Sequence, residues 1–201
     1  MAAIIENIIP QQGFEKVRDA IGIILTEELN HQKQLQGFDE EITVYSERIT
    51  PMDEAEDLYF NVLLDSATYG GFTQKDSQGR TLYFIDVYTA GLAKSGKSGE
   101  SYSTDRLHKF MGMARYILSY SEYKTLGFEP GLIGGTYVES FATLDPAAKE
   151  DSNYTRFGRL QFAVRIQENQ LLWQGIELLG NDTTVKLEET NKGFKYIIDN
   201  N

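Results

Sequence analysis

The segment that decides the fold is Phe157-Gly158-Arg159-Leu160-Gln161-Phe162-Ala163-Val164-Arg165-Ile166-Gln167. Every second position of its central part is apolar: Leu160, Phe162, Val164 and Ile166. The positions between them are mostly polar: Arg159, Gln161, Arg165 and Gln167. A period of two residues is that of a β-strand, whose successive side chains point to opposite faces of a sheet. The pattern predicts a strand in a sheet with one face on the core and one face in water.

Other segments of the chain have strand character too, and we expect strands at 41–50, 57–69, 81–90 and 136–144. Residues 81–90 are apolar on both faces, which is typical of a central strand. Between the second and third of these strands, Gly70–Gly79 has the composition of a hairpin loop. Because three strands follow one another with short connections, the sequence indicates an antiparallel meander.

Two segments show helical periodicity. In the first, 11–35, apolar residues recur at steps of three and four: Phe14, Val17, Ile21, Ile24, Leu25 and Leu29. Gly37 is the expected stop. We expect the second helix to start at Ser103 or Thr104 and to end before Gly127, with one apolar face: Leu107, Phe110, Met111, Ala114, Ile117 and Leu118.

Together these segments predict an α+β fold with a mostly antiparallel sheet packed by two main helices. We expect residues 1–170 to form one domain. Residues 171–201 are expected to be a β-rich C-terminal extension of that domain, with strand candidates at 172–179, 183–189 and 194–199. Gly180–Asp182 and Asn191–Gly193 are the expected turns between them.

Composition excludes several classes of function. The chain has 201 residues, with 19 Lys and Arg against 30 Asp and Glu, no Cys and two His. It therefore has no disulfides, no Cys-ligated metal and no His-rich metal site. Its net charge of −11 disfavours a general grip on nucleic acid, which relies on cations that neutralise phosphate. No apolar run approaches the roughly 20 residues of a membrane helix, and the first residues lack a signal-peptide pattern, so we expect no membrane partner.

The most conspicuous motif is Gly91-Leu92-Ala93-Lys94-Ser95-Gly96-Lys97-Ser98, which satisfies the P-loop pattern G-x-x-x-x-G-K-[ST]. In a P-loop, Lys97 would reach the β- and γ-phosphates and Ser98 would hold magnesium. Three features favour a plain loop instead. We expect no strand after the motif to supply the Asp of the magnesium site, and Asp86 lies on the strand before it. Residues Gly99–Ser103 resist helix formation where a P-loop helix should begin, and the expected meander lacks the parallel sheet of that fold.

The remaining candidates are weaker. The acidic groups Asp39–Glu41 and Asp53–Asp57 lack the spacing of a calcium loop, so we interpret them as solvated turns. His31 and His108 have no nucleophile setting around them and are expected at the surface. A tyrosine group, Tyr116, Tyr120 and Tyr123, is expected to pack in the core or at a subunit interface.

The order of segments resembles that of the tail terminator (tail completion) proteins of tailed bacteriophages and of related neck proteins. The resemblance covers roughly residues 11–168. It rests on a first helix, a meander that contains Leu82–Tyr88, a long loop, a second helix over 105–120, Leu126-Gly127-Phe128, a strand at 136–144 and the strand Arg159–Ile166.

This resemblance implies a structural virion protein without catalytic residues, cofactor or metal. Such a subunit forms a ring, typically a homohexamer, at the head-proximal end of the tail tube. The ring stops tube polymerisation, joins the tail to the head-side connector and is assembled in the host cytoplasm. Its partners would be further copies of itself, the tail tube protein and the connector, with DNA passing through unbound. The alternatives are another head–tail connector or neck subunit, or a P-loop enzyme that uses Lys97 and Ser98.

Two groups of residues are the candidate functional sites on this interpretation. Long polar loops order on contact with partners, so the candidate interface residues are Lys94, Lys97, Tyr102, Asn153 and Tyr154. A negative lumen repels DNA phosphates and lets DNA slide. The candidate acidic lumen residues are Asp53, Glu54, Glu56 and Asp57.

Overall fold

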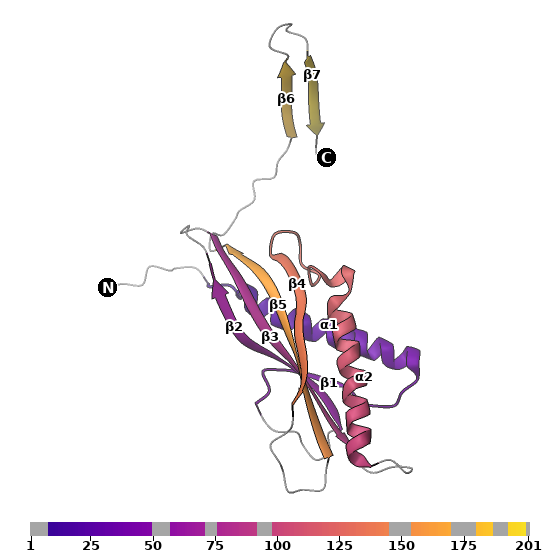
Figure 1. Ribbon diagram of the computed structural model, residues 1–201. Helices are drawn as coiled ribbons and strands as arrows, with labels where there is room; N and C mark the ends of the chain where they lie inside the picture. The colour runs from indigo at the N-terminus through magenta and orange to yellow at the C-terminus, as the bar shows by residue number, and fades with distance from the viewer. Residues whose placement is uncertain are drawn as a thin grey trace, which may run out of the picture. The chain divides into compact units, whose positions relative to one another are not determined.

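A computed structural model describes residues 8–49, 57–70, 76–91, 98–144, 154–169, 180–186 and 193–199. The chain divides into two compact units, Met1–Gln170 and Leu171–Asn201. In chain order, the first unit contains α1 (Gly13–Gln36), β1 (Thr43–Ser46), β2 (Leu58–Tyr69), β3 (Asp76–Gly91), α2 (Gly99–Ser119), a short 3₁₀ helix (Ser121–Tyr123), β4 (Ile133–Leu144) and β5 (Tyr154–Asn169). Figure 1 shows these elements along the chain.

The five strands form one sheet in the order β1-β2-β3-β5-β4. Every pair is antiparallel except β1 with β2, which is parallel. The α+β fold with a mostly antiparallel sheet is therefore confirmed, and β3 is central as expected. The expected meander is wrong at its first step. β1 has only four residues, so the chain needs to run back only about 13 Å from the end of β1 before it can start a parallel strand beside it. The eleven residues between Ser46 and Leu58 can span that distance.

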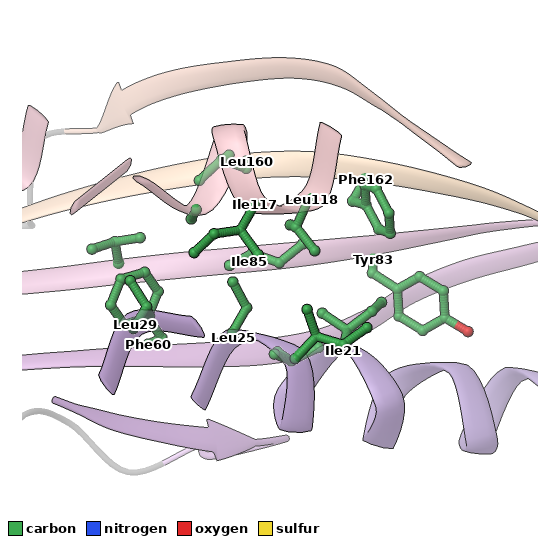
Figure 2. Close-up of a cluster of buried hydrophobic side chains, with 14 of the residues drawn as sticks. Ile21, Leu25, Leu29, Phe60, Tyr83, Ile85, Ile117, Leu118, Leu160 and Phe162 are labelled. Carbon is green, nitrogen blue, oxygen red and sulfur yellow. The ribbon is translucent and has the colours of Figure 1, made fainter. Parts of the chain in front are cut away.

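Both helices lie on the same face of the sheet. Residues of β3 that share this face contact each helix in turn: Tyr83 donates a hydrogen bond to the carbonyl of Phe14 in α1, and Thr89 donates one to the carbonyl of Ser103 in α2. The apolar faces predicted for the helices meet the apolar face of the sheet there (Figure 2). The core includes the predicted β5 set: Leu160, Phe162, Val164 and Ile166.

The first helix ends as its sequence predicts. Gly37 adopts a left-handed conformation at φ 64° and its N–H caps the carbonyl of Lys33. The helix start is fixed by a reciprocal pair, in which Gln12 and Glu15 each bond the other's backbone. A carboxylate oxygen of Glu168 in β5 also accepts the N–H of Phe14, which ties the helix start to the sheet.

The second helix begins earlier than expected, at Gly99 rather than at Ser103 or Thr104. Ser98 is its N-cap, and its side chain accepts the N–H of Ser101. The hydroxyl groups of Ser103 and Thr104 donate to the carbonyl of Glu100 within the helix, so they do not compete with it. The residues that we expected to resist helix formation therefore form its first turn.

Several other boundaries shift. The strand at 136–144 begins at Ile133 and the strand at 157–167 spans Tyr154–Asn169. Residues 76–79 of the expected hairpin loop belong to β3. The second unit contains an antiparallel hairpin of β6 (Gly180–Lys186) and β7 (Gly193–Asp199). Gly180–Asp182 is therefore strand rather than turn, and the strand candidate 172–179 lies outside the described residues.

Candidate functional site

The sheet face opposite the helices carries an aromatic row that crosses four strands. Tyr59 of β2, Tyr88 of β3 and Phe157 of β5 are directly opposite one another in the register. Their rings stack, with centroids 4.5 Å apart for Tyr59 and Tyr88 and 4.6 Å apart for Tyr88 and Phe157. Tyr45 of β1 meets Tyr59 edge to face at 5.6 Å. We call these four residues the aromatic row.

An arginine covers each end of this row. The guanidinium of Arg48 lies 4.4 Å from the ring centre of Tyr45 and 4.7 Å from that of Tyr59. Asn61 fixes the backbone of Arg48 through two hydrogen bonds. The side-chain oxygen of Asn61 accepts the N–H of Arg48, and its side-chain amide donates to the carbonyl of Arg48. At the other end, the guanidinium of Arg159 lies 5.5 Å from the ring centre of Phe157. These contacts have the geometry of cation–π interactions.

The next row of the same face contains a buried ion pair. The side chain of Asp86 is only 1% exposed and accepts two hydrogen bonds from Arg159, at 2.7 and 2.8 Å. Burial raises the pKa of Asp86 above its ordinary value, and the hydrogen bonds from Arg159 act in the opposite direction. The expectation of a fully wet face is therefore wrong here, because Tyr59, Asn61, Asp86 and Ala163 are all buried.

Most residues of the edge strand β4 are exposed. From Glu139 to Leu144 every residue is exposed, although Ser140–Leu144 are paired with β5. Three large apolar side chains are among the exposed groups of this strand: Tyr137 at 51%, Phe141 at 60% and Leu144 at 36%. Its one charged residue, Glu139, is paired with Arg80 of β3, which lowers the pKa of its carboxyl group.

Close packing explains why the P-loop-like motif begins with a glycine, Gly91. A Cβ at Gly91 would lie 2.5 Å from the carbonyl oxygen of Gly99 and 3.0 Å from the backbone nitrogen of Ser103. Beside it, the Arg106 guanidinium donates to the carbonyl of Ala90 at 2.7 Å. The end of β3 and the start of α2 therefore approach so closely that only glycine fits at position 91.

The structure bears on two of our objections to a P-loop. The objection from helix-breaking residues is wrong, because α2 begins directly after Ser98. The objection from topology is confirmed, since β3 pairs antiparallel with both of its neighbours. Lys94 and Lys97 lie outside the described residues.

The remaining candidate residues do not gather into one site. Among the candidate lumen residues, Asp57 is exposed just before β2, while Asp53, Glu54 and Glu56 lie outside the described residues. Tyr102 is half-buried in the first turn of α2, with the Arg106 guanidinium 5.5 Å from its ring centre. Tyr154 is the first residue of β5, and Asn153 lies outside the described part.

The histidines and the second tyrosine group lie at the surface. His31 and His108 are exposed as expected. Tyr116 and Tyr120 are exposed, which excludes the core for both, and their ring centres are 6.1 Å apart. Tyr123 is half-buried and donates a hydrogen bond to Glu28 of α1, which raises its pKa to about 12. This group remains a candidate for subunit contact.

In the described ranges, no group of three or more His, Cys, Asp or Glu is arranged to hold a metal ion. No helix in the same ranges is long and apolar enough to cross a membrane. No protein-family model matches the chain, and no curated protein is significantly similar to it.

The sequence did not predict the Asp86–Arg159 pair. Its one signal was an aspartate inside the apolar run Tyr83-Phe84-Ile85-Asp86-Val87.

Proposed function

We propose that the protein is a structural virion subunit that forms a ring at the head-proximal end of a phage tail tube. In this role it stops tube polymerisation and joins the tail to the head-side connector. Its partners are further copies of itself, the tail tube protein and the connector, and it is assembled in the host cytoplasm. The proposal rests on the resemblance in segment order and on the surface of β4.

The observation that carries the proposal is the exposed edge of β4. A sheet edge offers unpaired N–H and C=O groups, which monomeric proteins protect with short strands, Lys, Pro or bulges. β4 has twelve residues with neither Lys nor Pro, and its register irregularities end at Ser140. Beyond this point the edge is regular and carries exposed Phe141 and Leu144. Such a surface suits assembly with another chain.

The charge of the chain fits a DNA conduit. A net charge of −11 disfavours retention of phosphate, so DNA that passes through the ring would slide rather than bind. On this proposal the acidic group Asp53, Glu54, Glu56 and Asp57 contributes to the lumen, and Asp57 is exposed as that role requires.

Native mass spectrometry of the purified chain over a wide concentration range tests the proposal. We expect a closed oligomer of one discrete size, with six copies as the family resemblance implies. A chain that stays monomeric at every concentration would contradict the ring. Matched measurements on Phe141→Ser show whether the exposed edge contributes, since this change removes apolar surface that is already in water in the monomer.

A second candidate function has one specific observation in its favour. Because α2 begins directly after Ser98, the chain has the strand, loop and helix order of a P-loop nucleotide site. The antiparallel neighbours of β3 argue against it. Magnesium-dependent ATP or GTP binding that Lys97→Ala abolishes would establish this candidate. We expect no such binding.

A further inference from the structure

We propose that the ring closes by antiparallel pairing of Phe141–Leu144 of β4 in one copy with Thr43–Ser46 of β1 in the next. This inference rests on the proposed ring function and names its interface. β1 and β4 are the two edges of the sheet in the part of the chain that the structure describes. A ring needs two different patches that fit each other, and the two edges of one sheet supply them.

The register places both edge segments at the same level of the sheet. One row of directly paired residues runs Thr43, Tyr59, Tyr88, Phe157, Leu144. Three residues further along β1, another runs Ser46, Val62, Ile85, Leu160, Phe141. The four residues of β1 and the last four of β4 therefore occupy the same four rows. A neighbouring copy needs no shift along the strands to bring the two segments together.

The strand directions also fit. β1 runs parallel to β2, and the steps from β2 to β3, from β3 to β5 and from β5 to β4 are each antiparallel. β1 and β4 consequently run in opposite directions. When a second copy continues the sheet with its helices on the same side, its β1 lies antiparallel to the first copy's β4. Thr43 then opposes Leu144 and Ser46 opposes Phe141.

Side-chain sizes match across this pairing. Exposed Phe141 meets exposed Ser46, and Tyr45 of the aromatic row meets exposed Ala142. Each bulky side chain therefore faces a small one, and cross-strand pairs of this kind bury apolar surface without overlap. Leu144 lies in the same row as the stacked rings, so the next copy would extend that row beyond Leu144.

Charge favours these segments as a contact between acidic subunits. Neither Thr43–Ser46 nor Phe141–Leu144 contains a charged residue. Four acidic residues flank the two segments: Glu41, Glu47, Glu139 and Asp145. Two of them have partners within their own copy. Glu47 accepts the N–H of Leu64 at 2.8 Å, and Glu139 is bonded to Arg80. Pairing at these edges therefore does not bring the carboxylates of Glu47 and Glu139 together without partners.

Engineered cysteines test the pairing directly, because the chain has no cysteine of its own. The proposal puts residues 46 and 141 opposite each other, with Cα atoms about 4.5–5.5 Å apart, within the range of a disulfide. Within one copy the same residues are four strands apart, about 19 Å, which is too far for a disulfide. In the double variant Ser46→Cys/Phe141→Cys, any disulfide between these residues therefore joins two copies.

We expect mild oxidation of this double variant to give a ladder of covalent oligomers on a non-reducing gel, up to the size of the ring. Each single variant should stay uncrosslinked. The matched control Ser46→Cys/Tyr137→Cys places the second thiol on β4 about 13 Å from position 141 and should also stay uncrosslinked. A double variant that is folded by circular dichroism but no longer forms the ring in sedimentation also supports these edges as the interface.

Three results would overturn the pairing. The first is a double variant that forms the ring but does not crosslink. The second is a dimer from the single variant Phe141→Cys, which would indicate that two β4 edges pair about a twofold axis. The third is a control that crosslinks as well as the double variant. A wild-type chain that stays monomeric would contradict the proposed function itself, whereas these results contradict only the edge pairing.

Discussion

Replacing Arg159 by alanine should destabilise the protein through the carboxylate that it leaves behind. Asp86 is 1% exposed, and its two strong hydrogen bonds come from Arg159. Removing one partner of a fully buried pair typically costs about 3–5 kcal/mol, because the other charge stays buried. The Arg159 side chain is 30% exposed, so water can take part of its place. We therefore expect the free energy of unfolding to fall by about 2–3 kcal/mol at neutral pH.

The pH dependence of this loss distinguishes a buried charge from lost packing. Arg159 lowers the pKa of Asp86 against the effect of burial, so without Arg159 this pKa rises further above its ordinary value. The folded variant then binds a proton more readily than the unfolded chain does. Its stability relative to wild type should recover as the pH falls through the raised pKa, since protonation removes the unpaired charge.

Urea unfolding followed by circular dichroism measures both effects. With an m-value of about 2 kcal/mol/M, the expected loss moves the midpoint by about 1–1.5 M at neutral pH. Arg165→Ala is the matched control, because Arg165 lies on the same strand and the same face but is exposed, and it should change stability by less than about 0.5 kcal/mol. Equal losses for the two variants, or a loss for Arg159→Ala that does not change with pH, would refute this reasoning.

Three further predictions concern the core and the start of α2. Phe162→Ala should cost about 3–5 kcal/mol in urea unfolding because Phe162 is fully buried, and a loss as small as that of Arg165→Ala would show that the sheet faces are wrongly assigned. Gly91→Ala should lower the thermal midpoint through a loss of about 1–3 kcal/mol, since its Cβ would meet the backbone of α2 at 2.5 Å; unchanged stability would contradict that close approach. Ser98→Ala should cost about 1 kcal/mol by loss of the N-cap, and stability equal to wild type in thermal melts would argue against that cap.

The sequence predicts those parts of the fold that depend on local periodicity. The alternation of Leu160, Phe162, Val164 and Ile166 identifies both the strand and its buried face. Gly37 ends α1 because its left-handed conformation is a local property of glycine. Features such as these need no knowledge of which segments are neighbours in space, and they are confirmed.

Features that depend on long-range pairing were beyond the sequence. The parallel partner of β1 and the position of Asp86 opposite Arg159 follow from registers between strands that are far apart in the chain. The start of α2 at Gly99 depends on the capping by Ser98 and on close contact with Gly91, which outweigh the weak helix propensity of that turn. The candidate interface and lumen residues stay predictions, because most of them lie outside the described residues.

Electron microscopy of the purified wild-type chain tests the central claim most directly. The proposal predicts closed rings with a central hole, of one size and with sixfold symmetry in class averages. At higher resolution, the surface that lines the hole should carry an excess of acidic side chains. Particles that are only monomers, or a ring whose lumen is strongly basic, would contradict the proposed function.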